Sequence, residues 1–215
     1  MTQRYNIILL FGLLITFTGV GYVKASDSSA VEQVIQHGFP DQPGALAGTT
    51  QSLFMEYKAT NNVLSLVFYS YGMLRQANHY LMANDIIRAS EFAKTGFFYL
   101  DEAVELHEDN PKVRYMRARV DAWLTTDKGR CVITLKDTDL MLKNTSAFNA
   151  ALLAHINVMR YRALMNCNEP QQATVLLEKM KRESPHSAAV LNSGNAPEWD
   201  MNEVTQILLP LVKGK

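Results

Sequence analysis

The chain has 215 residues, of which 47% are hydrophobic and 20% are charged. This composition is ordinary for a globular protein and excludes an intrinsically disordered chain. Lysine and arginine together number 21, as do aspartate and glutamate, so the formal net charge is zero. Without an overall basic charge, electrostatics give no support to a nucleic-acid-binding function.

The N-terminal segment has the features of a secretory signal peptide. Arg4 supplies a positive charge, and residues 7–23 form an uncharged, largely apolar run. Val23-Lys24-Ala25 then ends in a small residue, as a signal-peptidase site requires. We therefore expect cleavage after Ala25 and export to the periplasm or beyond. Because the run is longer than most signal-peptide cores, an uncleaved anchor in the inner membrane, with the remainder facing outward, is the alternative.

Residues 26–51 have the character of a lead-in segment that precedes the main fold. Ser29 and Glu32 have the spacing of a capping box, which predicts one short helix here. Residues 39–44, Phe-Pro-Asp-Gln-Pro-Gly, are typical of turns or extended chain. The expected divisions are therefore a signal peptide or anchor at 1–25, a lead-in segment at 26–51 and a helical domain at 52–215.

From residue 52 onward, apolar residues recur at three- and four-residue steps, which is the period of an amphipathic α-helix and not of a β-strand. Asn61-Asn62 is placed to break the first helical stretch, and the next one closes at Leu81-Met82. Asn84-Asp85 then offers an N-cap for a long helix that ends before Pro111. These patterns predict an all-α fold.

Further helices are expected in the second half of the chain. Pro111 suits the first turn of one, and the others are expected at 131–142, 147–165 and 175–180. Asn144-Thr145-Ser146 is expected to cap the helix that starts at 147. After Asp200, a capping box with Glu203 predicts a C-terminal helix that caps the end of the helix stack.

The turns that close successive helix pairs lie at 109–111, 144–146 and 184–185, with spacings of about 35 and 39 residues. A two-helix repeat of about 34 residues is the tetratricopeptide (TPR) signature. Residues 100–124 resemble a TPR boundary, with Ala103 and Ala118 where that family places small residues. The resemblance implies antiparallel helix pairs in a TPR-like right-handed bundle or short solenoid with a C-terminal capping helix. It also implies that Lys112, Tyr115 and Arg119 face a concave groove.

Arginine and tyrosine lie close together on two expected helices, around Tyr115 and around Tyr161. These residue types are enriched where proteins bind one another. The alternative is a solvated face with intrahelical ion pairs, such as Arg117 with Asp121. The expected partner-binding residues are Lys112, Tyr115, Arg119, Arg160 and Arg162.

Two expected helices each carry three closely spaced aromatic residues, within 68–71 and 97–99. Core packing is the simpler explanation for them. The alternative is a cleft for an apolar or cyclic small ligand, as in a carrier that serves a transporter. Tyr69, Tyr71 and Phe97 would line that cleft.

Cys131 and Cys167 are the two cysteines of the chain. Both lie in the part expected to be exported, where disulfides form and persist, so we predict that they form one bridge. The alternative is a pair of buried, inert thiols.

Signatures of catalysis and of metal binding are missing from the sequence. None of the five histidines is spaced four residues from another, and no Gly-x-Ser-x-Gly motif occurs. The carboxylate pairs Asp101/Glu105 and Asp137/Asp139 are expected on solvated helix faces. The sequence therefore predicts an exported, non-enzymatic scaffold that needs no cofactor or metal and binds a protein or peptide, with the small-ligand carrier as the alternative.

Overall fold

The computed structural model of the chain describes residues 28–183 and 198–214. Over these residues the fold is all-helical, and no β-strand occurs in them. The expected signal peptide or anchor at 1–25 and the expected turn at 184–185 lie outside the described residues. Among the helices that are described, none is both long enough and apolar enough to cross a membrane.

The N-terminal half consists of four helices, and the capping box of the first is confirmed. Ser29 accepts a hydrogen bond from the Glu32 N–H, and the Glu32 carboxylate accepts one from the Ser29 N–H, both at 3.1 Å. The helices are α1 (Ala30–His37), α2 (Pro43–Thr60), α3 (Val63–Met82) and α4 (Ile86–Leu106).

Helix α2 begins at Pro43, inside the segment expected as a lead-in at 26–51, so the turn or extended chain expected at 39–44 is wrong for its last two residues. Proline is well suited to the first turn of a helix because its missing N–H would have no intrahelical partner there. Leu46, Thr50 and Leu53 of α2 are buried, so this helix belongs to the packed body.

The break at Asn61-Asn62 and the cap at Asp85 are confirmed. Asn61 has a left-handed backbone, with φ of 54°, and Asn62 caps α3 by accepting hydrogen bonds from two N–H groups of its first turn. Asp85 caps α4 in the same way, through the Arg88 N–H at 3.1 Å. The starts of α3 and α4 are therefore each set by a local side chain that satisfies otherwise unpaired N–H groups.

The second half starts with α5, whose first residue is Pro111, as expected. The helix expected at 147 instead begins at Ala150, because Asn149, and not Asn144, caps it through the Leu152 N–H at 2.9 Å. Residues Thr145–Ala147 form a short 3-10 turn. The helices are α5 (Pro111–Asp121), α6 (Cys131–Lys143), α7 (Ala150–Asn166) and α8 (Pro170–Glu183), the last extending beyond the expected 175–180 at both ends.

The disulfide between Cys131 and Cys167 is confirmed, with a Cα–Cα distance of 5.6 Å. Cys131 is the first residue of α6, and Cys167 is the C-cap of α7. The turn at 144–149 shortens α7 to 17 residues against 13 for α6. This difference of four residues amounts to only about 6 Å of helix rise, so the two cysteines meet at the ends of their helices that lie away from this turn.

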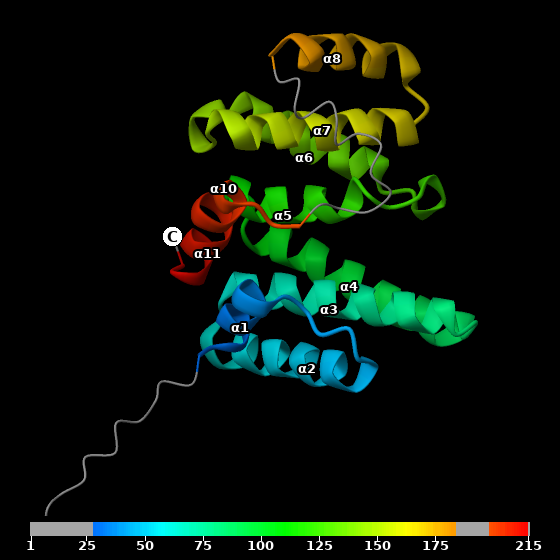
Figure 1. The fold of residues 1–215 in the computed structure, drawn as a ribbon, viewed down its shortest axis with the longest axis vertical. Coiled ribbons are helices and arrows are strands. Elements are labelled where there is room, and N and C mark those ends of the chain that lie inside the picture. The colour runs from blue at the N-terminus through cyan, green and yellow to red at the C-terminus, as the bar shows by residue number, and fades with distance from the viewer. Residues whose placement is uncertain (1–27, 184–197, 215) are drawn as a thin grey trace, which may run out of the picture.

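Each helix from α2 to α8 packs against the next one in the chain. Figure 1 shows these helices stacked in layers along the longest axis, with α1 and α2 at one end and α8 at the other. Helices α2 and α3 pack closely, because a Cβ on Gly72 of α3 would overlap the side chain of Thr50 of α2. Ala118 is fully buried, which agrees with the small residue expected there for close helix contact.

The C-terminal segment, defined here as residues 198–212, does not lie on α8 at the end of the stack. Its capping box is confirmed, because Asp200 and Glu203 exchange side-chain and backbone hydrogen bonds. Its helical part packs on α3 and α7, in the middle of the molecule (Figure 1). It consists of α10 (Met201–Glu203), the π-helical turn η4 (Val204–Leu208) and α11 (Leu209–Val212).

Candidate binding surfaces

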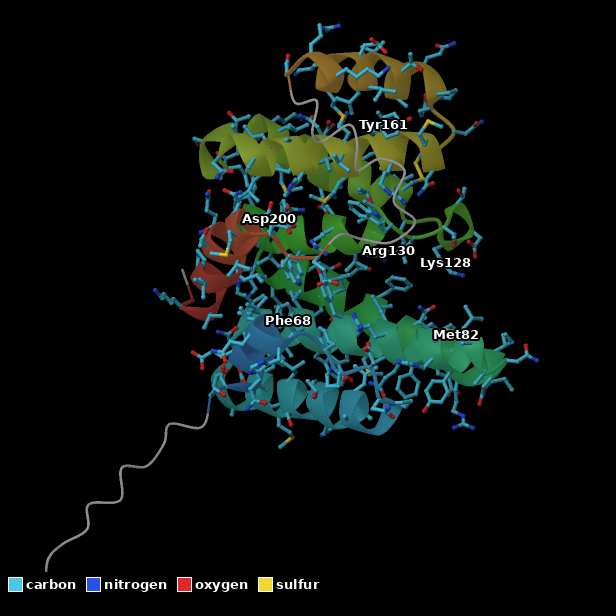
Figure 2. All side chains as sticks on the ribbon, in the orientation of Figure 1. Phe68, Met82, Lys128, Arg130, Tyr161 and Asp200 are labelled. Atoms are coloured by element: carbon cyan, nitrogen blue, oxygen red, sulfur yellow. A yellow bond between two sulfur atoms is a disulfide. The ribbon has the colours of Figure 1, made fainter. Side chains whose placement is uncertain are left out.

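Tyr115 and Arg119 are four residues apart and therefore lie on the same face of α5. They were expected to face a groove, but Tyr115 is fully buried and Arg119 is only 7% exposed. The reason is that the C-terminal segment covers this face (Figure 2, where Asp200 marks the start of α10). Lys112, on the same helix, is half-buried.

Glu203 is the central group of this contact. Its Oε1 accepts hydrogen bonds from the Tyr115 hydroxyl at 2.7 Å and from Arg119 Nε at 2.8 Å. Its Oε2 accepts the Asp200 N–H at 3.1 Å, which closes the capping box. The Glu203 carboxylate is therefore buried but satisfied, as a buried charge must be.

Trp199 contacts two side chains of the body. Its ring is parallel to that of Tyr71 within 9°, with centroids 6.3 Å apart. On it lies the Arg119 guanidinium, whose central carbon is 3.6 Å from a ring centroid of Trp199, a cation–π geometry. The Tyr71 hydroxyl in turn donates to the Met116 carbonyl at 2.6 Å, which links α3 to α5.

Both tyrosines are neutral donors here. Burial raises the pKa of Tyr115 well above its ordinary value, and the neighbouring Glu203 carboxylate raises it further. Burial also raises the pKa of Tyr71 far above the ordinary value, and Arg119 offsets this effect only in part. Each hydroxyl therefore keeps its proton for its hydrogen bond.

His155 of α7 completes the cluster. Its Nδ1 lies 3.2 Å from the Tyr115 hydroxyl, and its Nε2 lies 3.5 Å from Asp200 Oδ2. His155, Asp200 and Glu203 are donor types that metal ions use, and they lie near one another. However, Glu203 is already bound by Arg119, whose positive charge opposes a cation at the same oxygen. We therefore assign no metal to this cluster.

A second surface is the hollow between α7 and α8, which has a volume of about 510 Å³. We call it the α7–α8 groove. Arginine and lysine, three apolar side chains and two glutamines surround it, and among the described residues none that lines it is acidic. The lining residues are Arg160, Leu164, Gln171, Gln172, Val175, Leu176, Lys179 and Arg182.

The structure separates the two arginines that flank Tyr161 of α7, which is labelled in Figure 2. Arg160 lines the α7–α8 groove and pairs with Asp139 of α6 at 2.7 Å. Arg162 instead donates from Nε to the Ala122 carbonyl at 2.9 Å, with its guanidinium over the Trp123 ring. Arg162 therefore joins α7 to the end of α5 and does not share the position of Arg160.

The three aromatic residues of the alternative cleft have different neighbours. Tyr69 packs against the rings of Phe54 and Tyr99, with centroids 4.6 Å and 5.2 Å away. Tyr71 stacks on Trp199, and Phe97 lies under the Arg130 guanidinium. These contacts are those of packed side chains.

The sequence interpretation missed a buried ion network. Asp137 was expected on a solvated face, but it is fully buried and accepts hydrogen bonds from Arg117 Nε at 2.8 Å and Arg114 at 3.1 Å. Asp121, which the sequence suggested as a partner of Arg117, instead accepts a hydrogen bond from Arg130 Nε at 2.6 Å. Asp101 connects the Arg117–Asp137 pair to the Arg130–Asp121 pair, because it accepts hydrogen bonds from Arg117 at 3.1 Å and from Arg130 at 2.7 Å.

This network ties α4, α5 and α6 together next to the disulfide, since Arg130 precedes Cys131. A weak signal was present in the sequence, namely arginines and aspartates on consecutive helices that could pair across them. Their pairing depends on how the helices are rotated about their axes, which the sequence pattern alone does not determine.

Comparison with known proteins finds no match for this chain among protein-family models, curated proteins or solved structures.

Proposed function

We propose that this chain is an exported, non-enzymatic scaffold that binds a segment of another protein in the α7–α8 groove. In this proposal the stacked helices are TPR-like antiparallel pairs, and the groove lies between the helices of the last pair. The observation that carries the proposal is the chemistry of the groove lining, which combines basic and apolar side chains.

The groove is suited to a peptide that is both acidic and apolar. Lys179 and Arg182 lie on the exposed side of α8, while Arg160 of α7 lines the groove and pairs with Asp139, so the exposed positive charge is on α8. Val175, which is 72% exposed, and the half-buried Leu176 provide the apolar surface of the groove. Arginine beside apolar side chains is the usual composition of protein-binding sites, and positive charge selects and steers an acidic partner.

Export is supported by two independent features. One is the apolar N-terminal run before Ala25, from which we propose that the mature protein starts at Ser26 and is periplasmic or secreted. The other is the Cys131–Cys167 disulfide, because disulfides persist mainly in oxidising compartments outside the cytosol. The small-ligand carrier has less support, since Tyr69, Tyr71 and Phe97 are engaged in packing contacts.

The test is affinity capture from a cell-envelope extract with the mature protein and two charge-reversal variants. Lys179→Glu/Arg182→Glu reverses the exposed charge of the groove, and Lys94→Glu/Lys128→Glu reverses two exposed lysines elsewhere. We expect mass spectrometry to find a protein captured by wild type and by the Lys94/Lys128 variant but not by the groove variant.

Equal capture by all three proteins would refute the groove as the binding site. Native mass spectrometry of the mature protein tests the carrier alternative. A small molecule that is retained at stoichiometric amount would favour the carrier over the scaffold.

A further inference from the structure

The contact between the C-terminal segment and the body is chemically one-sided. The body supplies donors, which are the Tyr115 hydroxyl, Arg119 Nε and the Asn149 amide, and the segment supplies the acceptors Glu203 and Asn202. Tyr115 and Arg119 belong to α5, Asn149 is the N-cap of α7, and α3 contributes the Tyr71 ring. We call this surface the C-terminal site, lined by Tyr71, Tyr115, Arg119, Asn149 and His155.

The contact between the segment and the body contains the residue types that dominate the affinity of binding interfaces. Tryptophan, tyrosine and arginine are the usual hot-spot residues, and here Trp199 lies against both Tyr71 and Arg119. Four positions after Trp199, Glu203 takes the two central hydrogen bonds from the body.

An apolar stripe follows the polar start of the segment. Ile207, Leu208 and Leu211 are at most 1% exposed, while Thr205 and Leu209 on the other side are exposed. An amphipathic helix that lays its apolar stripe into a groove is a common mode of peptide recognition.

The segment itself is a weak helix. Its regular part consists of three residues of α10, five of a π-helical turn and four of α11, and Pro210 lies within α11. π-Helical turns are rare and occur frequently at functional sites, and proline removes a backbone donor. The segment is therefore held in place mainly by its contacts with the C-terminal site, which makes it a candidate for local opening.

We propose that the C-terminal site is a peptide-binding site that the chain's own C-terminal segment occupies, and that a partner helix of the same chemistry binds there by displacing it. The partner is an amphipathic helical segment with an aromatic residue followed four positions later by a carboxylate, and then by an apolar stripe. This site is distinct from the α7–α8 groove and does not depend on the function proposed for that groove.

Hydrogen–deuterium exchange of the wild-type chain tests whether the segment opens by itself. We expect amides of Val204–Val212 to exchange at least tenfold faster than those of Met116–Val120 in α5, because opening the segment leaves the helix layers folded. Equal exchange rates in the two regions would overturn the proposal, because the segment would then open only when the whole protein unfolds.

A peptide titration tests whether the vacated site binds. The probe is a fluorescein-labelled peptide of residues 198–214, and its anisotropy is followed while the full-length chain is added. Apparent affinity falls in proportion to the fraction of protein in which the site is open. Glu203→Gln in the full-length chain weakens the binding of the attached segment to the C-terminal site. We therefore expect this variant chain to bind the wild-type peptide at least tenfold more tightly than the wild-type chain does.

The matched control is a peptide that carries Trp199→Ala and Glu203→Gln, which we expect to bind at least tenfold more weakly. Circular dichroism shows whether the Glu203→Gln chain is folded. If that chain is not folded, the full-length Asn202→Ala variant, which loses only the hydrogen bond from Asn149, is used in its place. We expect this variant, too, to bind the wild-type peptide more tightly than the wild-type chain does. A folded variant that binds the wild-type peptide no better than the wild-type chain does, or no better than it binds the control peptide, overturns the proposal.

Discussion

Replacing both cysteines by alanine tests how much the cross-link stabilises the stack. Cys131 and Cys167 are 36 residues apart in sequence and join the start of α6 to the end of α7. In the chain-entropy account, a bridge that closes a loop of this length lowers the entropy of the unfolded chain by about 13 cal/mol/K. At 25 °C this amounts to about 4 kcal/mol of the free energy of unfolding.

Both cysteines are half-buried, so alanine leaves little cavity and the loss should be dominated by the open loop. For a protein of this size, about 4 kcal/mol corresponds to a decrease in Tm of roughly 8–16 °C. Urea and thermal unfolding followed by circular dichroism measure both quantities. Reduced wild-type protein should match the double variant, and Val132→Ala, an exposed neighbour of Cys131, should stay within about 0.5 kcal/mol of wild type.

A double variant within about 1 kcal/mol of oxidised wild type would refute this reasoning. It would mean that the unfolded chain keeps enough residual structure between α6 and α7 for the cross-link to restrict little. Thiol counting on unreduced, denatured protein provides the independent check, and we expect no free thiol.

The other predictions concern packing, charge and pH. Asp137→Ala should lower the free energy of unfolding by about 3–5 kcal/mol, because it removes the buried carboxylate that pairs with both Arg114 and Arg117 and leaves Arg117 with Asp101 alone. Asp139→Ala, at a pair whose carboxylate is half-exposed, should cost under about 1 kcal/mol in the same urea titration. Gly72→Ala should destabilise by about 1–3 kcal/mol through the clash with α2, whereas Gly48→Ala, with open space around it, should stabilise by about 0.5–1 kcal/mol; equal effects would show that α2 and α3 are not in close contact. The raised pKa of Tyr71 means that the unfolded chain ionises first, so its contribution is present below about pH 10 and is lost as the pH rises further. Between pH 10 and 12, the free energy of unfolding, measured by urea titration at each pH, should therefore fall less steeply with pH in Tyr71→Phe than in wild type, by about 1.4 kcal/mol per pH unit. An identical dependence on pH in the two proteins would contradict the burial of Tyr71.

Local features of this chain could be predicted from the sequence because their causes lie within a few residues. The capping boxes at Ser29 and Asp200 and the caps at Asn62 and Asp85 each depend on a side chain and N–H groups no more than four positions away. The choice between Asn144 and Asn149 as the cap of α7 was missed, because two competing caps lay within one short stretch.

The disulfide was also predictable, since two cysteines in a chain that the sequence predicts to be exported offer a single pairing. Whether the two cysteines could meet depended on the length of the turn at 144–149, which the start of α7 at Ala150 decides.

Burial of the charged residues was decided by the tertiary structure alone. The partner of Arg117 lies 20 residues away on α6, and that of Arg119 lies 84 residues away in the C-terminal segment. Helical periodicity shows which residues share a face, but not which other helix covers that face. Tyr115 and Arg119 do share a face, as the sequence indicated, yet only the folded chain brings Glu203 onto it, because a contact across so many residues depends on the path of the whole chain.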